Sequence, residues 1–407
     1  MAQPGSWSPE RPDSPAWIIL DTKARTGRRD DGTTARTVTS TGSTIAVSLM
    51  AVDPPGVSHC VVHCPELITA GANLMMRNPP IVSGAGGRFL LLSVRFPHRD
   101  VFIYKIGATP SLHLVPRPYP RNLGFDHVGV LPCHNNDDAI TSCGEHCLVV
   151  VLENLLNSGE LHVFSTETQS WTTKVARVHG GRDWVWYQQT KVLDVGGGVL
   201  AWVDLRHGVL LCNVLAEDPV IRLIKLPPLM PINNDIYGLR SDGIIPPLQG
   251  IRDATCCANG MIRLIELEYP GLNNDNGIGE TGTIDHCLRR WRVTIFERMV
   301  YADRWEKRRA VDSTDLFPAA DSCLPDEIWN YEESRLKCDV CMDPMLSAYQ
   351  EDVVYMTCKL DARDTRGWVL PVDTGARKLE KAMPFSDQRL YFNHNYMQLD
   401  FNKYLLG

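Results

Sequence analysis

Residues 192–228 indicate the fold of this chain most clearly, and they read VLDVGGGVLAWVDLRHGVLLCNVLAEDPVIRLIKLPP. The stretch holds four short apolar runs, Val192–Val195, Val199–Val203, Val209–Leu215 and Val220–Leu226. Between them lie Gly196–Gly198, Arg206–Gly208 and Glu217–Pro219, and Gly, Asp and Pro in such positions are typical of tight turns. The stretch therefore predicts four consecutive antiparallel strands.

The same alternation of short strands and turns recurs along the rest of the chain. Further apolar runs of this kind are Phe89–Phe96, Val101–Ile106, Cys147–Leu152, Leu161–Phe164, Trp171–Val178, Met261–Leu267, Trp291–Phe296, Val353–Cys358 and Trp368–Val372. Successive rounds of three or four strands lie roughly 40–60 residues apart, which is the spacing of blades in a β-propeller. Sandwich domains would instead repeat after seven to nine strands. The sequence predicts a mostly β, antiparallel propeller-like fold of about six blades with few short helices in loops.

The chain is expected to be one large β domain rather than several. We expect the Pro- and Ser-rich residues 1–15 to be a disordered leader and residues 16–407 to form a single propeller-like domain. The strand near Trp17 is predicted to pair with Tyr391–Phe401 and close the ring. The Asn-, Gly- and Asp-rich segments Asn233–Gly250 and Asn273–Asp285 are predicted to be insertions in loops, and helical periodicity is expected only near Asp326–Leu336.

Composition limits the classes of partner and compartment. The 407 residues are 44% hydrophobic and 22% charged, with a net charge of −7, so nucleic-acid binding, which depends on Lys and Arg, is disfavoured. No apolar run approaches the roughly 18 residues that span a bilayer, and residues 1–15 lack the apolar core of a signal peptide. We expect a cytoplasmic or nuclear protein whose 13 cysteines are mostly buried free thiols.

Several segments of the chain resemble one plant family that is expanded in grasses, the domain of unknown function numbered sixteen-eighteen. They are residues 17–21 (WIILD), 39–42 (TSTG), 59–65, 200–215 (LAWVDLRHGVLLCNVL), 226–228 (LPP), 368–373 (WVLPVD) and 401–405 (FNKYL), with the family signature over about 200–375. The resemblance implies a propeller-like fold similar to F-box-associated domains. It implies no activity, and it brings no catalytic residue to this chain.

The most distinctive of these segments has a structural interpretation of its own. Trp202 and Leu205 are predicted to fill a blade core. Asp204 and Gly208 suit a tight turn, Asp204 by accepting hydrogen bonds from nearby backbone and Gly208 by tolerating positive φ.

Two groups of soft ligands are candidate metal sites. The first group lies within fifteen residues and comprises Cys133, His134, Cys143, His146 and Cys147. Zinc binds four such ligands, but the spacing differs from the usual paired C-x2-C. The second group, Cys338 and Cys341, is a C-x2-C without a second pair, and Cys358 is isolated in sequence. The first group is either a zinc site or an exposed loop followed by a strand that starts near Cys147. The second group is half of a zinc site, a redox pair or without a functional role, so we assign no catalytic, cofactor-binding or metal residue.

Other apparent motifs have simpler structural interpretations. Gly196, Gly198 and Ala201 match part of a dinucleotide fingerprint, but a predicted strand follows instead of the required helix. Leu324–Ile328 resembles the start of an F-box, and we expect only one capped helix there, with Asp326 and Glu327 in its first turn.

Three further clusters are candidate binding surfaces. Arg25, Arg28 and Arg29 are followed at once by Asp30 and Asp31, which predicts a solvated loop. The pairs Arg289–Arg290 and Arg308–Arg309 flank the strand Trp291–Phe296 and are expected to be exposed, with a basic surface as the alternative. In the aromatic string Trp184–Tyr187 one strand face is expected to be core and the other a possible ligand surface.

These observations favour a non-catalytic binding module with a protein partner, without cofactor, metal or membrane. The alternative is an enzyme or metalloprotein whose site is assembled from several blades. Carboxylates clustered in a central pocket would favour that alternative, and a dry apolar channel would exclude it.

Overall fold

The structure is a computed structural model, and it describes residues 15–65, 79–95, 98–117, 119–120, 128–133, 145–153, 155, 159–179, 189–238, 246–257, 260–270, 290–322, 324–338, 340–361, 364–386 and 396–400. Residues 1–14 of the expected leader, the string Trp184–Tyr187 and the insertion Asn273–Asp285 lie outside these ranges. The described part consists mostly of antiparallel β-strands, as the sequence predicts.

The N-terminal region forms a nine-stranded sheet in the order β2-β3-β4-β1-β5-β6-β7-β8, and β29 also pairs with β1. Its strands are β1 (Trp17–Thr26), β2 (Ala35–Val38), β3 (Thr44–Met50), β4 (Val57–His63), β5 (Ile81–Gly86), β6 (Phe89–Arg95), β7 (Arg99–Lys105), β8 (Ser111–Leu114) and β29 (Tyr396–Asp400).

An eight-stranded sheet follows in the order β13-β14-β15-β16-β12-β11-β10-β9. It contains β9 (Gly129–Pro132), β10 (Cys147–Glu153), β11 (Gly159–Ser165), β12 (Ser170–His179), β13 (Lys191–Gly196), β14 (Val199–Asp204), β15 (Gly208–Asn213) and β16 (Val220–Lys225). Within it, β12 and β16 run parallel and join two antiparallel groups of four strands.

The C-terminal region contributes three smaller sheets. A four-stranded sheet holds β17 (Arg252–Cys256), β18 (Met261–Glu268), β19 (Arg292–Met299) and β20 (Glu306–Asp312). A six-stranded sheet holds β21 (Phe317–Pro318), β24 (Val340–Leu346), β25 (Val353–Lys359), β26 (Arg366–Asp373), β27 (Lys378–Leu379) and β28 (Met383–Ser386). The short strands β22 (Trp329–Asn330) and β23 (Arg335–Leu336) pair with each other.

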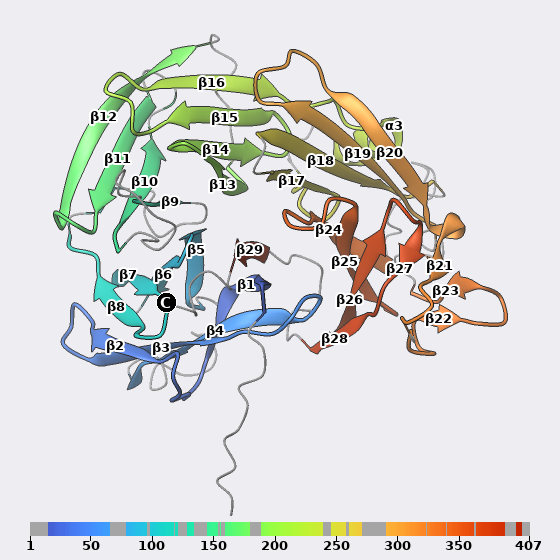
Figure 1. The fold of residues 1–407 in the computed structure, drawn as a ribbon, viewed down its shortest axis with the longest axis horizontal. Coiled ribbons are helices and arrows are strands. Elements are labelled where there is room, and N and C mark those ends of the chain that lie inside the picture. Colours follow the sequence, from blue (N-terminus) through green and yellow to red (C-terminus); the bar gives the residue numbers. More distant parts are fainter. Residues whose placement is uncertain are drawn as a thin grey trace, which may run out of the picture.

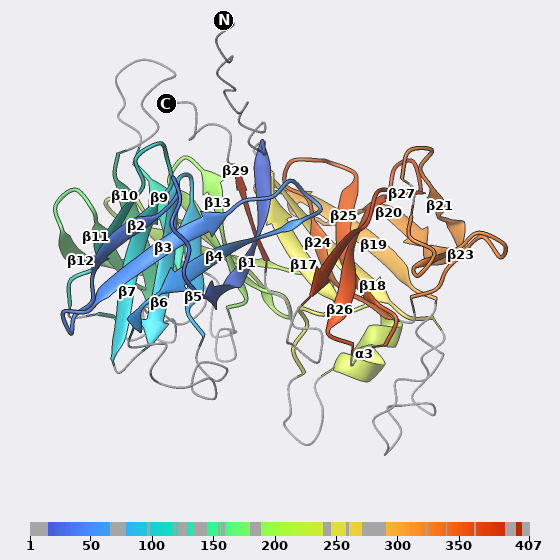
Figure 2. The same ribbon diagram turned by 90° about the horizontal axis from the view of Figure 1, so that it is seen from below.

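The sheets follow one another around a common centre, which gives the molecule a propeller-like shape (Figure 1). The strands β5, β9, β13, β17 and β24 lie toward the middle, whereas β12, β16 and β20 lie toward the outside. Seen from the side, β1 and β29 stand upright between the two halves of the ring (Figure 2). Stacking sheets around a centre covers apolar faces that a single four-stranded sheet would expose.

The turn at Gly196–Gly198 confirms that this segment is no dinucleotide-binding loop. All three glycines have positive φ, of 92°, 61° and 79°, which residues with a side chain rarely adopt. They connect β13 to β14 by a hairpin, so a strand follows where a phosphate-binding loop would need a helix N-terminus.

The two ends of the described chain close the ring, as predicted. β1 and β29 pair antiparallel, with Trp17 opposite Asp400. Trp17 stacks on Tyr349 with ring centroids 4.9 Å apart. The Gln398 side chain accepts from the Ala348 N–H at 2.8 Å and donates to the Leu346 carbonyl at 2.6 Å. These contacts connect the C-terminal six-stranded sheet to the first sheet.

The helix expected near Asp326–Leu336 is not formed, and that prediction was wrong. The Pro325 carbonyl accepts from the N–H groups of Ile328 and Trp329 in a tight turn, and the pair β22–β23 follows. The Asn330 side chain accepts from the N–H groups of Glu332 and Glu333 at 3.1 and 3.2 Å. Such local side-chain bonds compete with helix formation.

A short helix occurs instead at the start of the predicted insertion Asn233–Gly250. In the described part of the chain the one α-helix is α3 (Pro231–Tyr237), and it begins with proline, whose fixed φ suits the first helical turn. Among the described residues no helix is both long and apolar enough to pass through a bilayer.

Candidate functional site

A central cavity of about 60 Å³ is lined by residues of β1, β13, β17, β24 and β29 and of neighbouring loops. It is lined by Thr22, Thr190, Lys191, Leu205, Gln249, Arg252, Asp253, Asp343, Pro344, Met345, Tyr396 and Met397. A volume of this size holds a few water molecules. The lining combines charged side chains with apolar ones such as Leu205, Met345 and Met397, so it is not the purely apolar channel that would exclude a central site.

Asp253 connects three sheets at this centre. One of its oxygens is 2.7 Å from Nζ of Lys191 on β13, and the other accepts from the backbone N–H of Leu346 on β24 at 3.1 Å. Nζ of Lys191 also donates to the Ala254 carbonyl at 3.1 Å. The exposed fractions of the Lys191 and Asp253 side chains are 19% and 13%, so this pair is largely removed from water and both charges are compensated.

A second ion pair, Arg252–Glu266, lies fully buried beside the cavity. The two side chains are 0% exposed and approach to 2.5 Å. Arg252 also donates to the carbonyls of Leu205, Pro227 and Pro228 at 3.0, 3.2 and 3.0 Å. A buried charge needs a partner and further hydrogen bonds to offset its lost hydration, and Arg252 has both.

The other partner, Glu266, extends this network to helix α3. Its Oε1 accepts from the side chain of Asn233 at 2.7 Å and from the Met230 N–H at 2.8 Å. The carboxylate therefore fixes the start of α3 against β18.

The turn Asp204–Gly208 leads into the same network. Asp204 Oδ1 accepts from the N–H groups of Arg206 and His207 at 2.8 and 3.1 Å, and Oδ2 lies 2.8 Å from Nδ1 of His207. Trp202 is 0% and Leu205 4% exposed. The predicted roles of Trp202, Leu205 and Asp204 are confirmed.

The reason given for Gly208 was wrong. Its φ is not positive, but a Cβ there would lie 2.5 Å from the Ile224 carbonyl oxygen and 2.6 Å from Cδ1 of Leu223. Glycine is needed because the neighbouring strand passes too close for a side chain.

Residues 202–355 match the family model described as a protein of unknown function, DUF1618. The expected family resemblance is thereby confirmed for this segment. It contains Asp204, Arg252, Asp253 and Glu266, so most of the central polar network is built within it.

Comparison with solved structures finds only remote likeness. YCF48 bound to D1 peptide is 9% identical with a TM-score of 0.37, covering 90% of this chain and 84% of that chain. TolB from Acinetobacter baumannii is 10% identical with a TM-score of 0.32, covering 77% and 56%. The WD40 domain of SCAP from fission yeast is 8% identical with a TM-score of 0.29, covering 94% of each. We infer nothing from these proteins, and no curated protein matches the sequence.

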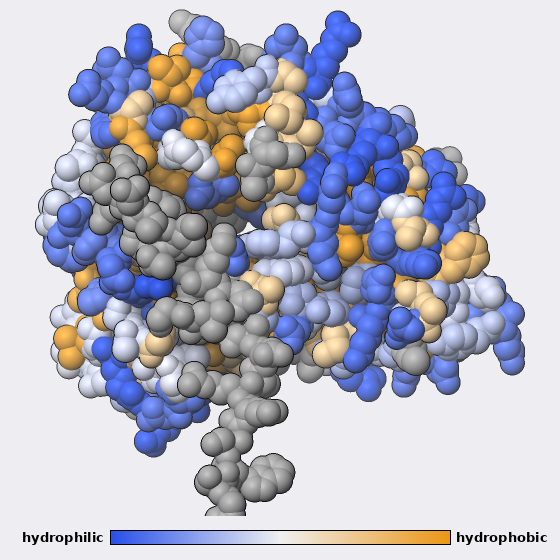
Figure 3. Space-filling model, viewed as in Figure 1, coloured by the Kyte–Doolittle hydropathy of each residue, from blue (hydrophilic) through white to orange (hydrophobic). Residues whose placement is uncertain are grey.

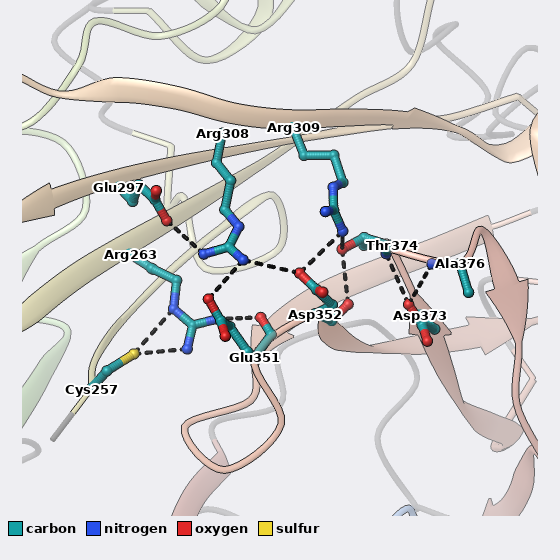
Figure 4. Close-up of polar contacts among 11 residues, drawn as sticks. Cys257, Arg263, Glu297, Arg308, Arg309, Glu351, Asp352, Asp373, Thr374 and Ala376 are labelled. Carbon is teal, nitrogen blue, oxygen red and sulfur yellow. Dashed lines mark hydrogen bonds and ion pairs between the residues drawn. The ribbon is translucent and has the colours of Figure 1, made fainter. Parts of the chain in front are cut away.

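A second polar cluster lies at the outer side of the DUF1618 segment, between the four- and six-stranded sheets (Figure 4). Arg308 on β20 contacts Glu297 at 2.8 Å, Glu351 at 2.7 Å and Asp352 at 3.3 Å. Arg309 lies 3.0 Å from the same Asp352. Hydrogen bonding to Glu297 raises the pKa of Arg308, so its charge persists at any physiological pH.

Arg263 completes this cluster, which we call the rim cluster (Arg263, Glu297, Arg308, Arg309, Glu351 and Asp352). The Arg263 guanidinium donates to the Glu351 carbonyl and contacts Sγ of Cys257 at 3.1 and 2.7 Å (Figure 4). Three arginines face three carboxylates, so the alternative of a basic surface at Arg308–Arg309 is not supported. Arg290 is likewise paired with Asp312, at 3.0 Å.

The first group of possible metal ligands is only partly within the described residues, because His134 and Cys143 lie outside them. The Cys133 N–H donates to the His146 carbonyl at 2.8 Å. Cys147 is buried in β10, and burial raises the pKa of its thiol to about 12. Among the described residues no three His, Cys, Asp or Glu side chains are placed to hold a metal.

The fold brings the second group, Cys338 and Cys341, next to Cys358, which is isolated in the sequence. Cys358 lies directly opposite Cys341 in the β24–β25 pair, with the two Sγ atoms 2.6 Å apart, and Cys338 is buried beside them. Burial raises the pKa of both the Cys341 and Cys358 thiols. Sequence spacing missed this contact because only strand register places residues 341 and 358 face to face.

Proposed function

We propose that this chain is a non-catalytic protein-interaction module built from six propeller-like blades. The blades are β1–β4 with β29, β5–β8, β9–β12, β13–β16, β17–β20 and β24–β28. We also propose a cytoplasmic or nuclear location. The ten described cysteines are all free thiols, which supports it. Plant origin and the likeness to F-box-associated domains stay predictions of the sequence.

The observation that carries this proposal is the internal pairing of charge at the centre. Lys191, Asp253, Arg252 and Glu266 satisfy one another and the backbone of neighbouring sheets. The space between them is about 60 Å³, far below the 300–1,000 Å³ typical of small-molecule sites. These side chains are placed to hold sheets together, which leaves recognition to outer surfaces.

One outer surface has the composition of a protein interface. We call it the Tyr301 surface, and it comprises Val175, Val220, Arg222 and Tyr301. Val175, Val220 and Tyr301 are 64%, 41% and 84% exposed, and the Arg222 guanidinium lies 5.6 Å from the centre of the Tyr301 ring.

Strand register and a hydrogen bond bring these residues together. Arg177 pairs with Val220 where β12 and β16 run parallel, so Val175 and Val220 lie at the same junction. Arg222 donates to the Val300 carbonyl at 3.0 Å, which holds Tyr301 beside it. Hydrophobic residues are visible over the sheet that contains this junction (Figure 3). Exposed aromatic and arginine side chains are enriched in interfaces.

The test is quantitative affinity purification of the full chain from its native tissue, with Tyr301→Ala beside wild type. Phe317→Ala is the matched control, because Phe317 is another exposed aromatic, 61% accessible, on β21. We expect a reproducible protein partner that Tyr301→Ala loses and Phe317→Ala retains. Equal recovery with both variants would contradict the assignment of this surface, and no partner from folded protein would contradict the module itself.

A second candidate function is an enzyme whose site is the central cavity. It is favoured by Asp253 and Asp343, two carboxylates from different sheets that line this cavity together with Lys191. Turnover of a small substrate that Asp343→Asn abolishes, without loss of folding, would replace the first proposal by this one.

A further inference from the structure

A groove of about 250 Å³ lies beside the first sheet, next to the loop that follows β1. Arg28, Arg29 and Asp30 from the β1–β2 loop line it together with Arg36 of β2, Thr44 of β3 and His63 of β4. The sequence predicts only a solvated loop at Arg28–Arg29. The fold adds a third arginine, a hydroxyl and an imidazole from three other strands, and so converts the loop into one wall of a concave site.

The carboxylates near this groove pair with two of its three arginines. Asp30 lies 2.6 Å from Arg36, and Asp31 lies 2.5 Å from Arg29. The hydrogen bond from Arg36 lowers the pKa of Asp30, so both partners are charged. Three arginines against these two aspartates leave one positive charge. Within the described part of the chain Arg28 has no hydrogen bond or ion pair, so its guanidinium is available to a ligand.

His63 provides an independent indication of a ligand. Its Nδ1 is buried and has no hydrogen-bond partner among the residues that the structure describes. A buried polar atom without a partner costs stability, and such atoms occur where a ligand completes the hydrogen bonding. An imidazole and a hydroxyl beside guanidinium groups form a donor set that matches an oxyanion.

We propose that this groove binds a phosphate monoester, with Arg28, Arg36 and His63 as donors to its oxygens. Guanidinium groups match the planar, paired geometry of phosphate oxygens. A long polyanion fits less well, because Asp30 and Asp31 stand at the groove and the whole chain carries a net charge of −7. The site is separate from the Tyr301 surface and does not depend on the proposed function.

The test is calorimetric titration of the full chain with O-phospho-L-serine, inorganic phosphate and unmodified L-serine. The expected result is binding of phosphoserine, weakened about tenfold or more by Arg28→Ala, since a hydrogen bond to a charged group is lost. Arg25→Ala is the matched control, because Arg25 is an exposed arginine of β1 that does not line the groove. It removes the same charge nearby and is expected to leave the affinity within about twofold.

The arms of the titration separate the possible sources of phosphate. Tighter binding of phosphoserine than of inorganic phosphate identifies an esterified ligand, and equal binding identifies free phosphate, with the donor set supported in both cases. Absence of phosphoserine binding, binding of L-serine, or equal weakening by Arg28→Ala and Arg25→Ala would each overturn the proposal. His63→Gln, checked for folding by circular dichroism, is expected to weaken binding without removing a formal charge from the arginines.

Discussion

The buried pair Arg252–Glu266 and the rim cluster at Arg308 are both arginine–carboxylate ion pairs, but they differ in how far they are exposed to water. The first pair is 0% exposed on both sides, whereas Glu351 in the rim cluster is 66% exposed. Water screens exposed pairs, and their net contribution to stability is small. Breaking a buried pair leaves one charge without hydration or partner. Depth, and not the number of contacts, should therefore decide which arginine the fold depends on.

The largest effect is expected from removing the buried carboxylate. Glu266→Ala leaves Arg252 charged in a dry environment and frees the start of α3, and it should lower the free energy of unfolding by about 3–5 kcal/mol. Denaturant unfolding of the purified chain measures this. A loss below about 1 kcal/mol would show that Arg252 finds water or another partner, and the comparison of depths would fail.

A second effect tests whether Gly208 is required by close packing. Gly208→Ala places a methyl group 2.5 Å from the Ile224 carbonyl oxygen and should destabilise by about 1–3 kcal/mol. Gly32 is the matched control, because a Cβ there meets nothing within 4 Å and its φ is not positive. Gly32→Ala should leave the unfolding midpoint nearly unchanged. Equal behaviour of the two variants would contradict the packing explanation.

The strand pattern was predictable because its signals are local. Apolar runs and the residues of the turns, such as Gly196–Gly198, lie next to each other in sequence. The central network was not predictable in the same way. Lys191 and Asp253 are 62 positions apart, and Asp253 and Leu346 are 93 apart, so only the closed ring brings them together.

Two local predictions failed for specific physical reasons. The helix expected near Asp326 does not form, because backbone N–H groups donate hydrogen bonds to the Asn330 side chain instead. The sequence predicts a turn glycine with positive φ at position 208, but glycine is required there because the neighbouring strand leaves no room for a Cβ. The sequence predicts only a solvated loop at Arg28. The groove itself was not predictable, because Arg36, Thr44 and His63 reach it only through strand pairing.

A pH-dependent effect is expected from Asp312. Burial opposes its ionisation, but hydrogen bonds from Arg290 and Thr314 outweigh burial and hold its pKa at about 2, below the usual 3.8. The carboxylate therefore stabilises the fold above about pH 4, and this contribution is lost as pH falls through about 2. The difference in unfolding free energy between wild type and Asp312→Asn should shrink over this range. A difference that stays constant from pH 5 to about 2 would contradict the assignment.

The smallest effect is expected in the rim cluster. Arg308→Ala removes contacts to three carboxylates that are partly or well exposed, and should cost no more than about 1 kcal/mol. The effect should also decrease in high salt. Urea unfolding at two ionic strengths measures both. A loss as large as that of Glu266→Ala would show that the rim cluster, rather than the buried pair, holds the two sheets together.

The most direct test of the account is the single substitution Asp253→Ala, which leaves the Lys191 charge without its partner, followed by measurement of both unfolding and partner capture. The account holds that these central charges connect sheets and that recognition lies on the outer surface. We therefore expect a less stable protein that, while folded, captures the same partner as wild type. A protein of unchanged stability that loses its partner or an activity would contradict the account and place the function at the central cavity.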